Sequence, residues 1–260
     1  DRTAVAAALD RAQPDVVYHC AGAPHVGHSF QKTLSTFETN VHCTHRLFEA
    51  MRATGRPLRV VVTSSAMVYA SANEALHEDS PLIPSSPYGV SKLAQEIVAR
   101  EDPGPLRVSI ARAFNHFGPR QSPGFVSSDF ARRIADIEAG RFAPEIAVGN
   151  LDARRDLTDV RDTVRAYRLM ADGAAPGAIY NVCSGRAVVI RDLLDMLLRR
   201  ARVKIEVKTD PARLRPSDQP LVLGSPARIE RDLGWTAGIP LEQTLDDVLA
   251  YWRAQAASGA

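Results

Sequence analysis

Cysteine is scarce in this chain, which has only Cys20, Cys43 and Cys183 among its 260 residues. Their number is odd and no CxxC pair occurs, so the sequence indicates neither a disulfide framework nor a thiolate metal site. No apolar run approaches the length of about 18 residues that a membrane-spanning helix needs. We therefore expect a cytoplasmic protein that has no membrane partner.

A strong charge of either sign is also missing. The 32 lysines and arginines nearly balance the 30 aspartates and glutamates, and the basic residues are spread along the chain. This balance argues against a nucleic-acid partner. Two histidine pairs, His25 with His28 and His42 with His45, have a spacing that metal ligands use, but no carboxylate or thiolate is spaced to complete either site. We expect no metal.

The third absence is a glycine-rich phosphate-binding turn. A dinucleotide-binding domain opens with a strand, a glycine-rich turn and a helix, whose amide groups hold the pyrophosphate. Here residues 1–9 predict a helix and residues 15–22 predict a strand that runs into Gly22. No two glycines lie two or three positions apart, so neither GxGxxG nor GxxGxxG is present.

The most informative stretch that is present is Tyr88-Gly-Val-Ser-Lys92. Its ends are about one helical turn apart, so the phenol and the ammonium would share one face of a helix. A phenol normally keeps its proton up to a pKa of about 10, and a neighbouring cation favours the phenolate. Such a pair can exchange a proton with a hydroxyl or carbonyl group, although the same spacing also occurs on many solvated helices.

The surroundings of this pair indicate a site. Residues 58–65 form a β-branched run that ends in hydroxyls and predicts a buried parallel strand. Ser65 would lie at the carboxyl end of this strand, where open α/β sheets bind ligands. The helix of Tyr88 is expected to begin just after Pro-Ser-Ser-Pro at residues 84–87.

Periodicity and turn residues predict the remaining elements. The strand at residues 179–182 should return to the main sheet, which gives a doubly wound parallel α/β fold. We expect other strands at residues 106–114 and 203–207, the latter half-exposed, and helices at residues 130–140, from residue 159, at 188–200 and at 241–252.

The combination Ser65…Tyr88-x-x-x-Lys92 resembles the extended short-chain dehydrogenase/reductase family, the NAD-dependent epimerase/dehydratases. The resemblance implies a Rossmann-type sheet and NADP or NAD as the cofactor. It implies that Tyr88 is the acid/base, that Lys92 lowers the pKa of Tyr88 and holds the nicotinamide ribose, and that Ser65 polarises the carbonyl. The resemblance places Tyr88 and Lys92 at the cofactor, together with Ala21, Gly22, Thr63 and His116.

Family members carry strand–helix units, including the glycine-rich turn, ahead of the position that matches Asp1. The resemblance therefore implies a fragment whose sheet lacks its N-terminal strand–glycine-loop–helix units. It also implies a smaller, interleaved substrate domain. We expect residues 1–118 and 156–184 in the dinucleotide-binding domain and residues 119–155 and 185–260 in the nucleotide-sugar-binding domain. Helices near residues 37–51 and 88–100 resemble those that pair in the family's dimer, so we expect a homodimer.

Later stretches narrow the resemblance to the GDP-mannose branch of the family. These stretches are Asn115-His116, Gly118-Pro119, Gln121-Ser122, Gly124-Phe-Val126, Gly149-Asn-Leu, Arg155-Asp156 and Arg215-Pro-Ser. The branch implies a GDP-sugar substrate, and planar arginines grip a diphosphate better than lysines do. The residues expected at the substrate are Ser65, Asn115, Phe125, Val126, Arg155 and Arg215, with Arg154 as an alternative to Arg155.

One position discriminates between reactions of this branch. Dehydratases carry a glutamate that removes the C5 proton where this sequence has Met67, and the stretches 215–220 and 223–225 also resemble the reductase. We therefore expect reduction of the C4 ketone of GDP-4-keto-6-deoxy-D-mannose to GDP-D-rhamnose by NADPH or NADH. The alternatives are a GDP-mannose 4,6-dehydratase, a nucleotide-sugar C4 epimerase and a non-catalytic sugar-nucleotide-binding fragment.

Overall fold

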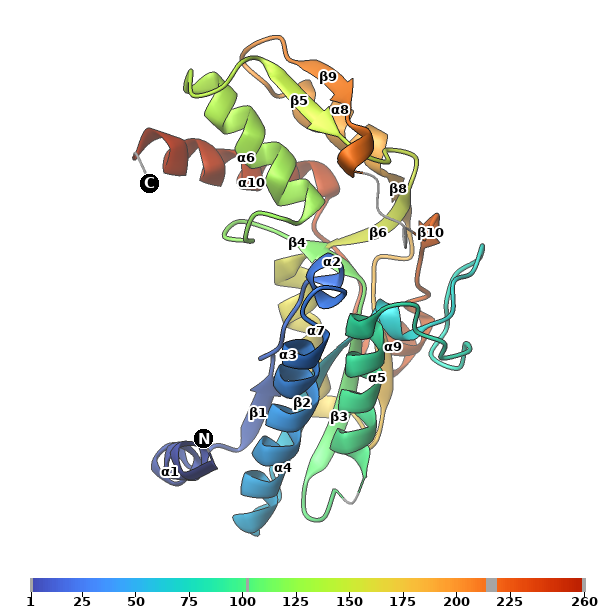
Figure 1. Ribbon diagram of the computed structural model, residues 1–260. Helices are drawn as coiled ribbons and strands as arrows, with labels where there is room; N and C mark the ends of the chain where they lie inside the picture. Colours follow the sequence, from blue (N-terminus) through green and yellow to red (C-terminus); the bar gives the residue numbers. More distant parts are fainter. Residues whose placement is uncertain (1, 102, 214–218, 259–260) are drawn as a thin grey trace.

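A parallel sheet of four strands forms the centre of the larger part of the molecule, which we call the main-sheet lobe. The computed structural model describes residues 2–101, 103–213 and 219–258 (Figure 1). The strand order is β1-β2-β3-β7, and every neighbouring pair is parallel. The strands are β1 (Val16–His19), β2 (Arg59–Ser65), β3 (Arg107–Ala113) and β7 (Ile179–Val182).

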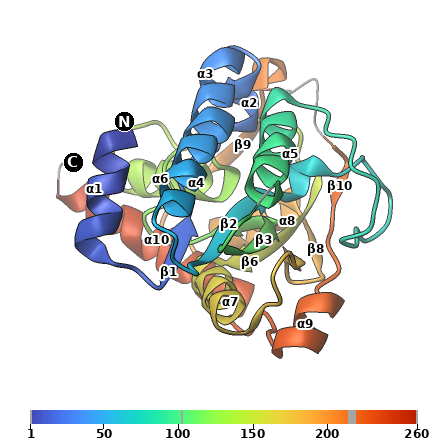
Figure 2. The same ribbon diagram turned by 90° about the horizontal axis from the view of Figure 1, so that it is seen from below.

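Helices cover both faces of this sheet because alternate side chains of a strand point to opposite faces. Val60 and Val62 of β2 pack on one face, against α1 (Arg2–Ala12), α4 (Cys43–Ala53) and α5 (Pro87–Arg100). Val61 packs on the other face, against α7 (Val160–Gly173) and α9 (Ala227–Leu233). Figure 2 shows the two helical layers on either side of the strands. The doubly wound α/β fold is thereby confirmed, as is the return of residues 179–182 to the main sheet.

The rest of the chain forms a smaller lobe with a core of its own. Its sheet has the parallel order β10-β6-β4, β8 pairs antiparallel with β6, and β5 pairs with β9. Its strands are β4 (Asn115–Phe117), β5 (Glu145–Val148), β6 (Arg154–Asp159), β8 (Ala187–Val189), β9 (Glu206–Thr209) and β10 (Leu221–Val222). Its helices are α6 (Val126–Glu138), α8 (Ile190–Leu198) and α10 (Leu241–Ala257), and their apolar faces meet in one cluster.

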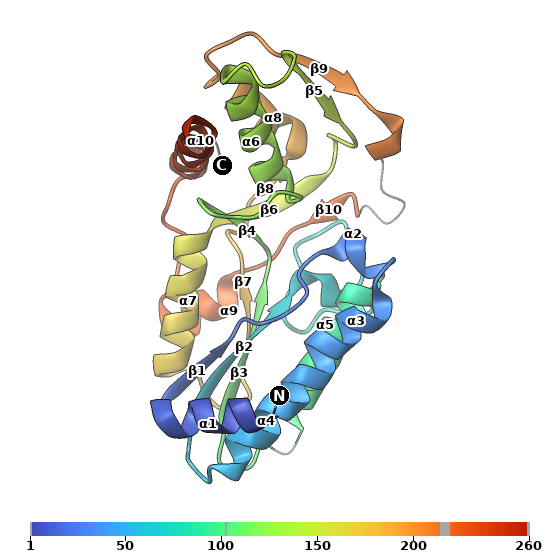
Figure 3. The ribbon, with the colours of Figure 1, turned by 60° about the vertical axis from the view of Figure 1, so that its left-hand side comes forward.

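The chain crosses between the lobes at the carboxyl ends of the main-sheet strands. β3 is followed almost at once by β4 of the small lobe, and α7 of the main-sheet lobe begins directly after β6. The carboxyl ends of β1, β2 and β3 therefore face the small lobe (Figure 3). The main-sheet lobe also has the short helices α2 (Val26–Ser29), α3 (Thr33–Phe37), the π-helix η1 (Glu38–His42) and the 3-10 helix η2 (Ala66–Val68). The 3-10 helix η3 (Pro211–Arg213) follows β9 in the small lobe.

One predicted strand was misplaced. The half-exposed strand expected at residues 203–207 lies instead at Glu206–Thr209, where all four residues are exposed. Ile205 precedes the strand and packs against the core of the small lobe, so its burial does not reflect strand alternation. Strand β9 exists because it pairs with β5, a partner 61 positions earlier in register, at Glu145 and Glu206.

The domain boundaries expected at residues 118, 155 and 184 remain a proposal. They fall just after β4, inside β6 and just after β7. Over the described part of the chain, no helix is both long and apolar enough to cross a membrane.

Candidate active site

Tyr88 lies in the first turn of α5, as the sequence predicted. Ser86 caps the helix, its Oγ accepting a hydrogen bond from Gly89 N at 3.1 Å, and Pro87 occupies the first turn, where the missing N–H costs nothing. The backbone N–H of Tyr88 donates to the buried Ser29 Oγ at 3.1 Å. Two serines thus fix the end of the helix that carries the phenol.

Gly89 lets this end of α5 approach η2. A Cβ at residue 89 would lie 2.3 Å from the carbonyl oxygen of Met67, closer than any side chain tolerates. Ser65 caps η2, with its Oγ accepting a hydrogen bond from Met67 N at 3.2 Å. The contact brings α5 and the end of β2 together, and the Ser65 hydroxyl acts on the Tyr88 phenol to lower its pKa.

The pKa of Tyr88 is raised above its ordinary value of 10.0 because the phenol is buried, and the hydrogen bond with Ser65 opposes the rise only in part. We expected a lowered pKa from the neighbouring ammonium. Burial outweighs the groups that favour the phenolate, because removing a phenolate from water costs more free energy than one hydrogen bond returns. Tyr88 therefore holds its proton at neutral pH and is a proton donor.

Lys92 is buried on the same face of α5, with 5% of its surface exposed. Its Nζ donates to the carbonyl oxygen of Thr63 at 2.6 Å and to Gln95 Oε1 at 2.8 Å. Burial lowers the pKa of Lys92 from 10.5 to about 8, and electrostatic interactions with Cys20 and Glu96 oppose this shift. The ammonium form still predominates at pH 7.

The turn after β1 lies beside this ammonium. A Cβ on Gly22 would stand 3.7 Å from Lys92 Nζ and only 2.9 Å from Asn40 Oδ1. Asn40 Oδ1 accepts from Ala23 N at 2.7 Å, and its Nδ2 donates to Ser91 Oγ at 2.9 Å. Ala21 is exposed next to Gly22. The structure thus brings Ala21, Gly22, Thr63, Tyr88 and Lys92 to one region.

Asn40 is a site residue that sequence reasoning missed. It is fully buried and lies in the π-helical turn η1, an irregularity that often marks functional sites. The sequence feature that could have revealed it is a polar amide within an apolar helical stripe. Core packing alone does not explain a polar residue at such a position.

Asn115 and His116 begin β4, which lies immediately beyond the end of β3. Asn115 is exposed and His116 is half-buried. His116 Nδ1 is 3.0 Å from the carbonyl oxygen of Phe114, and since a carbonyl only accepts, Nδ1 carries the proton. Burial lowers the pKa of His116, so the ring is neutral and Nε2 is an acceptor.

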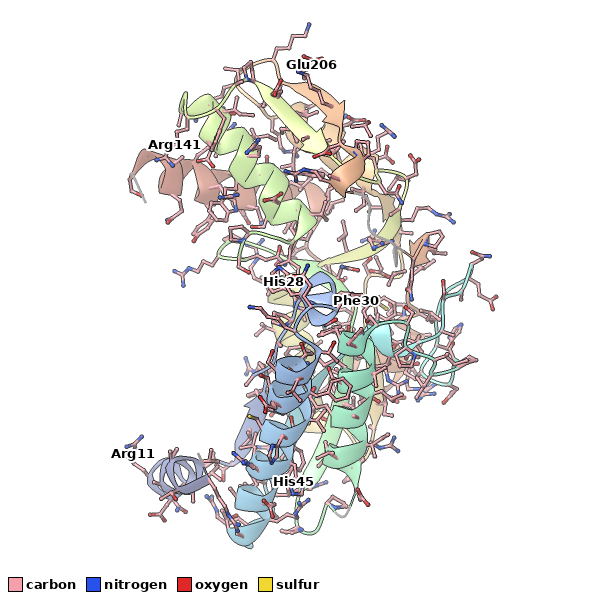
Figure 4. The ribbon with its side chains drawn as sticks, in the orientation of Figure 1. Arg11, His28, Phe30, His45, Arg141 and Glu206 are labelled. Carbon is pink, nitrogen blue, oxygen red and sulfur yellow. The ribbon has the colours of Figure 1, made fainter. Side chains whose placement is uncertain are left out.

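Phe125 and Val126 lie at the start of α6 in the small lobe, and Phe125 contacts His25 of the main-sheet lobe. The ring of Phe125 stacks on His25, with centroids 4.6 Å apart and an interplanar angle of 25°. His28 lies on α2, in the region where the two lobes meet (Figure 4), and its ring centroid is 4.8 Å from that of His25. His25 is therefore a further residue that sequence reasoning missed as part of this region. Among the described residues, no three His, Cys, Asp or Glu side chains gather as metal ligands.

Arg155 lies on β6 and is partly buried, whereas Arg154 is exposed. Arg155 Nη1 donates to the carbonyl oxygen of Gln219 at 2.7 Å. This bond ties the guanidinium to the segment ahead of β10. Arg215, the other arginine expected at the substrate, lies outside the described residues.

The carboxylate nearest to the triad in sequence is already engaged. Glu96 is 2% exposed and accepts two bonds from Arg112, with Nη2 at 2.8 Å from Oε2 and Nε at 3.0 Å from Oε1. It also accepts a hydrogen bond from Ser64 Oγ. A doubly paired carboxylate is a poor base, because protonating it would break a buried ion pair. Met67, half-buried on η2, supplies no titratable group.

Two cavities elsewhere in the molecule contain none of these residues. One of about 310 Å³ lies between α1 and α4, and one of about 230 Å³ lies beside Arg59 and Arg107 at the opposite end of the main sheet. Neither holds a buried acid/base pair, so the chemistry of the chain locates the site at Tyr88 instead.

Comparison with known proteins identifies relatives of the whole chain. A family model described as GDP-mannose 4,6 dehydratase matches residues 1–248. The chain is 39% identical over 249 residues to a GDP-6-deoxy-D-mannose reductase from Pseudomonas aeruginosa, covering 93% of this chain and 81% of that protein. It is 28% identical over 287 residues to a GDP-mannose 4,6-dehydratase from Vibrio cholerae, covering 97% and 76%.

Among solved structures, RMD from Pseudomonas aeruginosa complexed with NADPH superposes with a TM-score of 0.88 at 36% identity. The superposition covers 93% of this chain and 82% of that one. The likeness therefore extends over both lobes and not only over the parallel sheet.

Proposed function

The chain belongs to the GDP-mannose 4,6-dehydratase family, and on that premise we propose that it reduces the C4 ketone of GDP-4-keto-6-deoxy-D-mannose to GDP-D-rhamnose. The observation that carries the proposal is the close packing of α5, which carries the buried Tyr88 and Lys92, against η2, which Ser65 caps. Two hydroxyls of this kind can donate a proton and a hydrogen bond to the oxygen of a carbonyl that is reduced to an alcohol. The similarity to a reductase at 39% identity supports the same reading.

NADPH or NADH would supply the hydride, as the NADPH complex of the related structure suggests. The residues of this chain fit such a group at the β1 turn. Gly22 lacks the Cβ that would fill the space beside Lys92, and the ammonium can donate to a ribose hydroxyl. Ala21, Thr63 and His116 would complete the cofactor contacts.

Tyr88 would donate its proton to the ketone oxygen as hydride reaches C4. A raised pKa keeps that proton on the phenol until the oxygen becomes basic. Ser65 would donate a hydrogen bond to the developing alkoxide, a contact worth roughly 10²-fold in rate. Lys92 would then stabilise the phenolate that remains, since its charge lies about one helical turn away.

The absence of a base for C5 separates reduction from dehydration. Dehydration of GDP-mannose needs a group that removes the C5 proton, and a thioether at residue 67 cannot accept it. Glu96 is paired with Arg112 and does not substitute for that base. The 28% identity to a dehydratase is compatible with shared ancestry and a different reaction, reduction in place of dehydration.

The substrate would lie between the lobes. Asn115 can donate to a sugar or diphosphate oxygen, and Phe125 and Val126 can cover the nucleotide. Arg155 and Arg215 would grip the diphosphate with planar guanidinium groups. A C4 epimerase and a non-catalytic GDP-sugar-binding fragment are the competing hypotheses, and both predict no net reduction of the ketone.

Mass spectrometry of two incubations tests the proposal. In the first incubation, GDP-mannose should keep its mass when the enzyme is added. In the second, GDP-4-keto-6-deoxy-D-mannose should gain the mass of two hydrogens when the enzyme and NADPH or NADH are present. Loss of one water from GDP-mannose would instead establish a dehydratase. Binding of GDP without any oxidation of NADPH would favour the non-catalytic fragment.

The proposal includes a homodimer in the cytoplasm. α5 presents the apolar stripe Val90, Ala94 and Ile97 to solvent, and Ile97 is 58% exposed. Leu34 on the neighbouring α3 is 75% exposed. Contiguous exposed apolar residues favour burial against a second copy. The three cysteines are all free thiols, which fits a reducing compartment.

A further inference from the structure

Gln95 is an uncharged polar residue buried next to Lys92. It follows Lys92 by three positions on α5, and its side chain is fully buried. A buried amide must have its hydrogen bonds satisfied, because an unpaired one costs free energy. Its partners therefore indicate what the residue does.

Chemistry determines the orientation of this amide. The ammonium of Lys92 has only donors, so the Gln95 atom 2.8 Å from Nζ is the carbonyl oxygen Oε1. The amide nitrogen then points the other way and donates to Thr44 Oγ1 at 2.9 Å. Gln95 thus connects Lys92 on α5 to Thr44 on α4.

Thr44 is itself held from two sides. Its hydroxyl donates to the carbonyl oxygen of Asn40 at 2.7 Å and lies 2.7 Å from His19 Nε2. A hydroxyl has one proton and two lone pairs, so Thr44 accepts from both Gln95 and His19. Burial first, and the charge of Lys92 second, lower the pKa of His19 to about 4, so this ring is neutral at pH 7.

The hydrogen bonds that run from Thr44 through Gln95 end at the ammonium of Lys92. Within the described part of the chain, two of the three N–H groups of Lys92 are used by Thr63 O and Gln95 Oε1. With these two directions fixed, the third N–H is fixed as well. The position of a Cβ on Gly22 lies 3.7 Å from Nζ, which places the ammonium at the β1 turn.

We propose that Gln95, oriented by Thr44 and His19, is a positioning residue that aims the ammonium of Lys92 at the turn of Gly22. The role in cofactor binding rests on the proposed function. A neutral amide can hold the ammonium without neutralising it. A carboxylate at residue 95 would form a buried ion pair and compete with the ligand and the Tyr88 phenolate for the same charge.

Lysine titration by NMR tests the proposal without any turnover. The chain has four lysines, Lys32, Lys92, Lys204 and Lys208, so ¹³C-lysine labelling gives few signals, and a Lys92→Arg sample assigns the one of interest. The titratable groups that influence this titration are Cys20 and Glu96, and both remain in every variant.

Gln95→Met keeps the length of the side chain and removes its hydrogen bonds. The Lys92 midpoint should fall below that of the wild type, since the ammonium loses an acceptor, and KM for NADPH should rise roughly ten-fold. Gln95→Glu should move the Lys92 midpoint upward.

Thr44→Val should lower the Lys92 midpoint as Gln95→Met does, but more weakly. Thr36→Val is the control, because Thr36 is also buried and its hydroxyl donates to Lys32 O at the start of its own helix.

A folded Gln95→Met enzyme with an unchanged Lys92 midpoint and unchanged KM would overturn the proposal. If that variant does not fold, Gln95→Glu and Thr44→Val decide, and unchanged values in both overturn it equally. Failure of the wild type to reduce the ketone would count against the proposed function alone, because the titration requires neither substrate nor cofactor.

Discussion

The backbone of Met67 lies directly against Gly89, so close that a Cβ on residue 89 would be 2.3 Å from the Met67 carbonyl oxygen. This contact joins η2, which follows Ser65, to the first turn of α5, which carries Tyr88. The separation of the two reacting hydroxyls therefore depends on a glycine that itself bears no functional group.

Gly89→Ala should force α5 away from η2. The added methyl meets a backbone atom that cannot rotate aside, so we expect a loss of stability of at least about 1–3 kcal/mol. Activity should fall further than stability, because the Tyr88 and Ser65 hydroxyls move apart. Urea denaturation and steady-state kinetics measure the two effects. Gly238→Ala is the control, since nothing lies within 4 Å of its Cβ position.

Tyr88→Phe should remove the proton donor and leave the fold intact. We expect kcat for ketone reduction to fall by about 10²–10⁴-fold, the range of general acid loss. Binding of NADPH, followed by its fluorescence, should change little. Activity within a few-fold of the wild type would contradict the assignment of Tyr88 as the acid.

His19 should make the protein sensitive to acid. Its pKa is lowered from 6.5 to about 4 in the folded state, so the unfolded chain binds the extra proton between these pH values. Stability should therefore fall as pH decreases from 6.5 toward 4, by up to about 3 kcal/mol from this group. Urea midpoints measured across this range should fall less steeply for His19→Gln than for the wild type. Parallel curves would show that His19 titrates normally.

Ile97→Lys should weaken the proposed homodimer. A charge in the α5 stripe cannot be buried against a second copy without a partner. Sedimentation velocity at micromolar concentration should show a dimer for the wild type and a shift to monomer for the variant. Val164→Lys on α7 is a matched control, because Val164 and Ile97 are each 58% exposed. Equal behaviour of the two variants would place the interface elsewhere.

Local sequence patterns were sufficient for the elements that carry the proposed catalytic residues. The β-branched run at residues 58–65 became β2, and the Pro-Ser-Ser-Pro signal preceded α5, which begins at Pro87. Helical spacing alone placed Tyr88 and Lys92 on one face. These features depend on residues within a few positions of each other, which is why a single sequence reveals them.

Patterns failed where pairing partners are distant. Strand β9 was placed three residues too early because its register is set by β5 and not by its own alternation. The direction of the Tyr88 pKa shift was also wrong, because the effect of a neighbouring cation can be read from spacing but the extent of burial cannot.

The sequence by itself determined the family resemblance, the parallel α/β fold and the set Ser65, Tyr88 and Lys92. Only the tertiary structure decided how that set is held. Thr44 and Gln95 are 51 positions apart, and His19 and Gln95 are 76 apart, yet all three meet behind Lys92. Such contacts arise when helices pack on a sheet and buried polar groups must find partners, and no local propensity encodes which distant residue the partner is.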